Sequence, residues 1–254
     1  MMNGWPAKSL ILLSLFPMIS CKHLTASFGL LINLSAFSQQ MLPVALASKL
    51  DSMTMCAGKE KYFGELYLKT TRLVDSYIGS LSGKGNDLMM KMEENFATYF
   101  FKAIEAKNSG TPIPEVWKNY FNGDLSPLQL KLMGANAHIN GDIWQALTNN
   151  FSLEEIKQLK PFYRKYNKSI ENIFDDLFKS AIRSDKRLHD LHLITLGLDK
   201  VYGRMMLKRW RNRQLRLTIL KFENPSRFDK KKKRVDKKRN KIDRMIIRRL
   251  HVDE

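Results

Sequence analysis

A histidine and an aspartate lie four residues apart in segment 134–147, whose pattern is helical. That spacing puts His138 and Asp142 on one face of a helix, one turn apart. An imidazole and a carboxylate at this separation can share a hydrogen bond or bind one metal ion. A zinc ion with an open coordination position activates water for hydrolysis. The pair therefore predicts either a metal site or a buried polar network.

Three other polar residues extend the candidate site along the same helix. Asn136 and Asn140 form a second pair four residues apart, and Gln145 continues the face of His138 and Asp142. Polar side chains this dense in a helix of an apolar bundle need buried partners. We therefore predict that Asn136, Asn140 and Gln145 line a pocket or belong to a core network.

Two glycines in this helix indicate a close approach to its backbone. Gly134 and Gly141 lie seven residues apart and flank His138. Each costs about 1 kcal/mol relative to alanine inside a helix. That cost predicts that another helix or a ligand packs against the backbone there.

A metal ion would need further ligands besides the central pair. The side chains that can supply them lie elsewhere in the chain: His189, His192, Glu94 and Asp75. One divalent ion, such as zinc, is therefore the cofactor that the sequence allows, with a bound water for hydrolysis. No glycine-rich phosphate loop, Cys-x-x-Cys pair or nucleophile elbow in the sequence points to other chemistry.

The helical period continues through most of the chain, and no alternating strand pattern of useful length appears. Ser126 and Pro127 are suited to the N-cap and first turn of the central helix, which we expect to run to about Leu147. These features predict an all-α fold. It is a single bundle of six to eight helices over residues 39–222, followed by a basic tail at 223–254.

Residues 1–38 are predicted to be a signal peptide. Two apolar runs near the N-terminus are both shorter than the ~18 residues that a membrane-spanning helix needs. The second run ends in the triplet A-F-S, with small residues where a signal peptidase cleaves. We expect cleavage after Ser38 and a true start near Met18. The alternatives are a lipoprotein anchored at Cys21 and an uncleaved amphiphilic N-terminus that holds the protein on a membrane. Cleavage or lipidation would export the protein to the periplasm or the extracellular space.

Positive charge is concentrated at the C-terminal end of the chain, whose formal net charge is +18. From Arg204 to Glu254 there are 20 Lys and Arg against 6 Asp and Glu, so the preceding residues are nearly balanced. The basic runs lack the interleaved aromatics of a single-stranded nucleic-acid platform, so no specific nucleic acid is predicted. The surface-binding residues predicted in the tail are Lys230, Lys231, Lys232, Lys233, Arg234, Lys237, Lys238 and Arg239.

Near its end the tail has apolar residues at helical spacing with arginines on the other side. The apolar residues are Ile242, Met245, Ile246 and Leu250. Such a helix can bind an anionic membrane surface or an envelope polymer, and these are the partners that we predict. The alternative is a solvated extension that keeps the protein soluble.

Segment 136–142, N-A-H-I-N-G-D, resembles the signature of an uncharacterised bacterial family, a domain of unknown function. Members carry an N-A-H-I-N-x-D-L segment inside an all-helical domain. Segments 62–71 and 94–103 also resemble that family, and the resemblance covers most of residues 60–215. It implies an all-helical domain and brings no assigned activity. Ile143 stands where the family has leucine.

Segment 138–147, H-I-N-G-D-I-W-Q-A-L, is similar to the H-x-x-G-D-I-H-Q-P-L segment of the P1/S1 nucleases. Those are helical secreted zinc enzymes related to phospholipase C. The resemblance implies that His138 and Asp142 are zinc ligands with Gly141 as their spacer. Trp144 stands where those enzymes have another histidine, and Ala146 replaces their proline. The chain has too few histidines for their three-zinc centre, so a single ion is what the resemblance implies here.

Two functions therefore remain open. The first is an exported, minimal metal-dependent hydrolase built on His138 and Asp142. The second is a non-catalytic envelope-binding or structural protein whose basic tail docks on an anionic surface. A di-iron carboxylate protein would need paired Glu-x-x-His motifs, which the sequence does not contain. The sequence leaves open whether the protein is an enzyme, what its substrate is and how it oligomerises.

Overall fold

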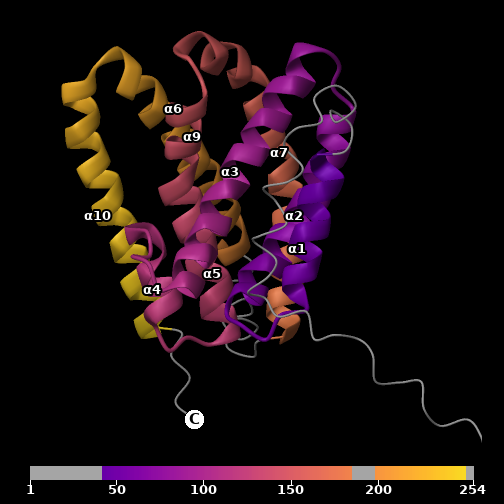
Figure 1. Ribbon diagram of the computed structural model, residues 1–254, viewed down its shortest axis with the longest axis vertical. Coiled ribbons are helices and arrows are strands. Elements are labelled where there is room, and N and C mark those ends of the chain that lie inside the picture. Colours follow the sequence, from indigo (N-terminus) through magenta and orange to yellow (C-terminus); the bar gives the residue numbers. More distant parts are fainter. Residues whose placement is uncertain (1–41, 185–197, 250–254) are drawn as a thin grey trace, which may run out of the picture.

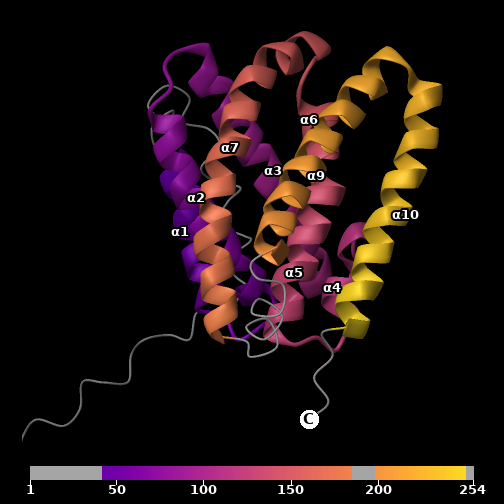
Figure 2. The ribbon, with the colours of Figure 1, turned by 180° about the vertical axis from the view of Figure 1, so that it is seen from behind.

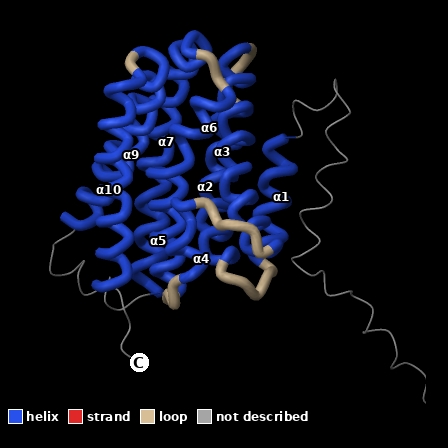
Figure 3. The backbone as a smooth tube through the Cα atoms, turned by 60° about the vertical axis from the view of Figure 1, so that its left-hand side comes forward, coloured by secondary structure: helices blue, strands red, loops and turns tan. Residues whose placement is uncertain are grey.

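The computed structural model describes residues 42–184 and 198–249. In these ranges the chain forms helices joined by short loops, without a strand (Figure 3). The α-helices are α1 (Leu42–Thr54), α2 (Glu60–Gly79), α3 (Lys84–Ser109), α4 (Lys118–Asn122), α5 (Pro127–Ala137), α6 (Ile143–Asn150), α7 (Leu153–Ser184), α9 (Leu198–Glu223) and α10 (Pro225–Arg249). A 3₁₀-helix, η3 (Glu115–Trp117), precedes α4, and a π-helix, η4 (His138–Asp142), joins α5 to α6. The predicted all-α bundle is confirmed.

The long helices run side by side along the bundle, and α10 forms one edge of it (Figures 1 and 2). Helices α1 and α2 lie on the opposite side, with α3, α7 and α9 between them and α10. The short helices α4 and α5 lie beside the C-terminal half of α10. The π-helix η4 follows α5 and contacts α3, α9 and α10. Within the described ranges, no helix is both long enough and apolar enough to cross a membrane.

Two apolar clusters fill the bundle. The first centres on α3, α6 and α7 and includes Tyr163, and the second centres on α1 to α5 and includes Trp117. Burying a side chain of this size stabilises the fold by roughly 1.5–3 kcal/mol. Ala137 belongs to the second cluster and Ile143 to the first. The π-helix between these two residues therefore lies where the clusters meet.

The start of the central helix agrees with the sequence, but its middle does not. Ser126 and Gln129 form a reciprocal capping box, and Pro127 occupies the first turn, as predicted. The expected single α-helix to Leu147 is wrong, because α5 passes into the π-helix before α6 begins. A π-helix widens one turn by one residue and is frequent at functional sites. That widening changes which side chains share a face beyond Asp142.

The close backbone approach that the two glycines predict is confirmed. A Cβ added at Gly134 would collide with the ring of Phe63 from α2. A Cβ added at Gly141 would lie 2.7 Å from a methyl group of Val116 in η3. Both neighbours are protein side chains, so the glycines allow helices to pack closely.

Helix α10 occupies most of the segment that sequence analysis separates as a tail. Residues 225–249 pack along α9, α5 and η4. The physical reason is a seven-residue repeat that places Phe228, Val235 and Ile242 on one face of the helix. Phe228 and Val235 are buried against Leu217 of α9.

The apolar residues near the C-terminus also differ from their expected role. Ile246 is buried in the second cluster, and the partly buried Ile242 packs against that cluster. Both side chains therefore face the bundle and not a membrane, whereas Met245 stays exposed. Leu250, the signal peptide at 1–38 and the lipoprotein alternative at Cys21 lie outside the described residues.

Candidate functional site

His138 and Asp142 meet inside the bundle as their spacing predicts. The Nδ1 atom of His138 lies 2.9 Å from Oδ2 of Asp142. The indole Nε1–H of Trp117, from η3, donates to the same oxygen at 3.0 Å. The side chains are buried, with His138 only 2 % exposed and Asp142 only 1 % exposed. The arrangement is a buried hydrogen-bonded trio.

Aromatic rings enclose the imidazole of His138. The ring of Phe96 stacks on it with centroids 3.5 Å apart, and the rings of Tyr67 and Phe63 lie at 4.7 and 5.5 Å. His138 Nε2 and Asp142 Oδ1 are buried without a hydrogen-bond partner. An apolar enclosure of this kind disfavours charge on either partner.

The pKa values of the pair move towards the neutral forms. Burial lowers the pKa of His138 well below its usual value, and the positive charge of Arg211 adds to that shift. Burial raises the pKa of Asp142 well above its usual value, although the hydrogen bond from Trp117 acts in the opposite direction. Burial therefore disfavours an ion pair between the two side chains and favours a hydrogen bond between them.

The described residues around the pair do not supply enough ligands for a zinc ion. Zinc takes at least three protein ligands in catalytic sites and four in structural ones. In the described part of the chain, no group of three His, Cys, Asp or Glu residues comes together. Glu94 is exposed, and Asp75 is half-buried on α2. His189 and His192 lie outside the described residues.

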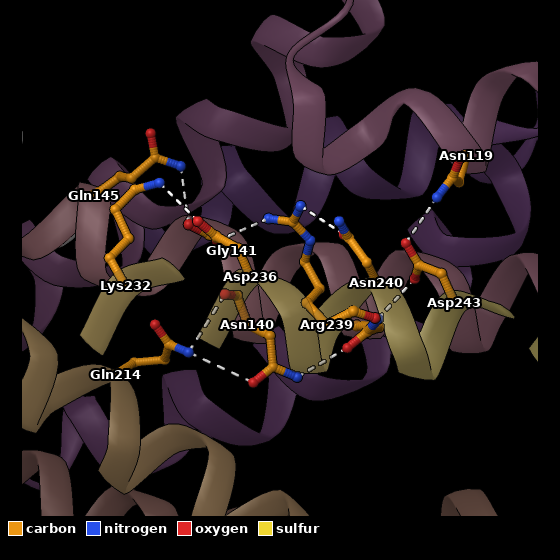
Figure 4. Close-up of polar contacts among 11 residues, drawn as sticks. Asn119, Asn140, Gly141, Gln145, Gln214, Lys232, Asp236, Arg239, Asn240 and Asp243 are labelled. Carbon is orange, nitrogen blue, oxygen red and sulfur yellow. Dashed lines mark hydrogen bonds and ion pairs between the residues drawn. The ribbon is translucent and has the colours of Figure 1, made fainter. Parts of the chain in front are cut away.

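The asparagines of the motif bind neighbouring helices. Asn136 Nδ2–H donates to the carbonyl of Arg239 at 3.0 Å and to Oδ1 of Asp243 at 2.7 Å. Asn140 donates to Oδ1 of Asn136 at 2.9 Å, and Gln214 of α9 donates to the Asn140 carbonyl at 3.3 Å (Figure 4). The pair predicted as pocket or network residues is therefore a network that joins α5, η4, α9 and α10.

Gln145 does not join this network. Its side chain is half-buried and donates to the carbonyl of Gly141 in η4, four residues before it (Figure 4). The sequence placed it on the face of His138 by counting α-helical turns. The π-helix inserts one residue into that count and turns Gln145 away.

Two more amides secure α10 to the body. Asn119 of α4 donates to Oδ2 of Asp243 at 3.0 Å (Figure 4). Gln129 of α5 donates to the carbonyls of Ile246 and Ile247 at 3.1 and 3.2 Å. Those carbonyls belong to the last turns of α10, where intrahelical partners run out. In these contacts with the C-terminal half of α10, the amides of the body donate and α10 accepts.

A second buried polar cluster, around Arg211 and Glu93, is not predicted by the sequence analysis. The guanidinium of Arg211 lies over the rings of Tyr163 and Tyr166, and its Nε–H donates to Asn167. Both carboxylate oxygens of Glu93 are buried, and the hydroxyl of Tyr166 is the neighbouring group that can donate to them. Burial raises the pKa of Glu93 to about 7, and the charge of Arg211 only partly offsets this.

The spacing of Glu93 contained a usable signal. It follows Met89 by four residues and precedes Phe96 by three, so it falls on the apolar face of α3. A cavity of about 10 Å³ lies beside this group, between Met92, Phe96, Tyr163 and Arg211. That volume holds about one water molecule and no substrate.

The predicted surface-binding residues are largely on the surface of α10. Its exposed cations are Arg227, Lys230, Lys231, Lys233, Arg234, Lys237, Lys238, Lys241, Arg244 and Arg248. We call these ten residues the basic face. Lys232 is half-buried, and Arg239 is only 4 % exposed. Asp236 accounts for both, because it pairs with Lys232 at 2.7 Å and with Arg239 at 3.4 Å (Figure 4).

The acids of α10 are segregated from its basic face. Asp229, Asp236 and Asp243 recur every seven residues and fall on one strip beside the buried side of the helix. Asp243 is buried, and burial raises its pKa despite hydrogen bonds from Asn119 and Asn136. The outward face therefore carries positive charge without interspersed acids.

Comparison with curated proteins and with solved structures finds no match. The similarity to the P1/S1 nucleases therefore rests on ten residues of sequence alone. A family of unknown function, DUF5995, matches residues 45–249 and so includes α10. The chain belongs to this family, in agreement with the resemblance of its central motif to a domain of unknown function.

Proposed function

We propose that this protein is a non-catalytic docking protein whose basic face binds an extended anionic surface that bears phosphate groups. The observation that carries the proposal is the segregation of charge on α10. Ten exposed cations lie on its outer side, whereas its three acids share one strip next to the buried side, with Asp229 exposed, Asp236 half-buried and Asp243 buried. A flexible tail would also be basic, but only a fixed helix holds the cations on one side.

The size of the charge favours binding to a surface. Each Lys or Arg near an anionic membrane contributes about 1 kcal/mol, and the attraction decays within a Debye length. Ten cations along 25 residues give a strong, salt-sensitive attraction without a pocket. They also speed the encounter with the surface.

The buried motif supports this function by holding α10 in place. Asn136 and Asn119 bind both oxygens of Asp243, and Gln129 caps the last turns of the helix. Binding then requires no ordering of α10, which avoids the entropic cost that a disordered segment has on binding. In this account the family motif positions the docking helix.

The alternative, a minimal metal-dependent hydrolase, has less support. His138 and Asp142 bind each other, and rings from three helices surround them. In the residues that the structure describes, no third ligand joins the pair. A hydrolase would also need space for substrate beside the pair.

Export is part of the proposal. The signal peptide expected at residues 1–38 would take the protein to the cell envelope, where lipid headgroups and polymers supply anionic surfaces. The proposal of export rests on the sequence alone. Detection of a mature N-terminus at Gln39 by mass spectrometry would support it, and an intact N-terminus in the cytoplasm would contradict it.

Vesicle co-sedimentation tests the docking function. Purified protein is mixed with phosphatidylglycerol vesicles or with neutral phosphatidylcholine vesicles. We expect binding to the first only. The triple variant Arg234→Glu, Lys237→Glu, Lys241→Glu removes the centre of the basic face, and at 0.1 M salt it should bind at least about tenfold more weakly.

A matched control separates location from net charge. The variant Lys157→Glu, Lys165→Glu, Lys168→Glu makes the same charge change at exposed positions on α7, away from α10 (Figure 2). We expect its binding to stay within about twofold of the natural protein, because those charges face elsewhere. Equal loss in both variants, or no binding by the natural protein, would overturn the proposal.

A further inference from the structure

We infer that the surface is a lipid bilayer, on which α10 lies flat with the side chain of Met245 seated among the lipids. The inference rests on the proposed function and names its partner. It concerns the orientation of the helix and one contact residue that charge alone does not explain.

Met245 stands apart from the other apolar residues of α10. Phe228, Val235 and Ile246 are buried against the bundle, whereas Met245 is 45 % exposed. On a helix it shares the outer side with Lys241 and Arg248, which lie four residues before it and three after it. The basic face thus contains one long apolar side chain among its cations.

A bilayer explains this combination better than a soluble polyanion does. Phosphates along a polymer would contact the cations and leave the thioether in water. At a bilayer surface, an apolar side chain enters the boundary between headgroups and acyl chains while Lys and Arg reach the headgroups. Methionine is flexible and adapts to such an irregular environment.

The shape of α10 agrees with a flat partner. Its 25 residues span about 37 Å, and the basic cations are distributed from Arg227 to Arg248 along that length. The helix forms an edge of the bundle, so a plane can approach its outer side (Figures 1 and 2).

Methionine oxidation footprinting tests the inference on the unaltered full chain. The protein is treated with hydrogen peroxide alone, with saturated phosphatidylglycerol vesicles or with inorganic polyphosphate, and each methionine is followed by mass spectrometry. Met55, 83 % exposed and in the loop between α1 and α2, is the internal control. Met89 and Met133 are buried and set the slow limit.

We expect phosphatidylglycerol vesicles to slow the oxidation of Met245 several-fold and to leave that of Met55 unchanged. Polyphosphate should leave both rates unchanged. Vesicle binding with Met245 oxidised at its free rate would overturn the inference and leave the proposed function standing. Equal protection by polyphosphate would overturn the assignment to a bilayer. Absence of binding to the vesicles would remove both the inference and the proposed function.

Discussion

The side-chain amide of Asn136 donates to the carboxylate of Asp243 at 2.7 Å and so joins two residues 107 positions apart. One belongs to the central motif and the other to α10. Both are buried, so the bond forms without competition from water. It connects the residues that look most like a chemical site to the helix that carries the basic face.

Replacing Asn136 with alanine should loosen α10. The change leaves Oδ1 of Asp243 and the amide of Asn140 without their partner, which we expect to destabilise the fold by about 2–4 kcal/mol. Urea unfolding measures the loss, and hydrogen exchange should locate it in α10. The exposed Asn122→Ala is the control and should change stability by less than about 0.5 kcal/mol. Normal protection of α10 in the Asn136 variant would refute this role.

Asp142 should tolerate asparagine better than alanine. Burial raises the pKa of Asp142 and so disfavours its charged form, and asparagine keeps an oxygen for Trp117. We expect Asp142→Asn to cost about 1 kcal/mol and Asp142→Ala about 3 kcal/mol in unfolding free energy. A chelator should leave the unfolding temperature of the natural protein unchanged. Bound metal that disappears in His138→Ala would contradict the interpretation as a core network.

Glu93 should make the fold less stable as pH rises. Its pKa in the folded protein is about 7, above the usual 4.5, so the folded state holds the proton more tightly than the unfolded state. Stability from this group is complete below about pH 4.5 and is lost as pH rises through about 7, a change of roughly 3 kcal/mol. Urea unfolding between these pH values measures it.

Two glutamine variants isolate that effect. Glu93→Gln should reduce the pH dependence of the unfolding free energy by the amount that Glu93 contributes. Glu94→Gln, at the adjacent but exposed position, should leave it as in the natural protein. Asp75, whose pKa burial raises to about 6, shifts stability in the same direction and remains in both variants. An identical pH dependence in the two variants would show that Glu93 is not the group responsible.

Gly134 should not tolerate a methyl group. A Cβ there would collide with Phe63, so we expect Gly134→Ala to cost about 1–2 kcal/mol even after the gain in helix propensity. Gly79 is the matched control, because nothing lies within 4 Å of a Cβ added there. Thermal unfolding should show Gly79→Ala to be neutral or stabilising. Equal effects at both positions would mean that helix packing at Gly134 is looser than described.

The sequence predicted the features that depend on local spacing. The contact of His138 with Asp142 and the cap at Ser126 each follow from residues within one turn. The glycines likewise revealed close packing, because their cost in a helix needs a reason.

Features that depend on tertiary contacts could not be predicted in this way. The π-helix that turns Gln145 away arises where α5 and α6 meet the two apolar clusters. The partner of Asn136 lies on α10, and no local pattern connects the two segments. The heptad of Phe228, Val235 and Ile242 is present in the sequence, but the many lysines of the segment favour its interpretation as a basic tail outside the bundle.

Binding of the full chain to phosphatidylglycerol vesicles as a function of sodium chloride tests the central claim most directly. If the basic face docks by charge, affinity should fall at least about tenfold between 0.05 and 0.3 M salt, because the Debye length shortens over that range. The Arg234, Lys237 and Lys241 triple variant should lose most of this dependence. Binding that does not respond to salt, or no binding at 0.05 M, would contradict the account.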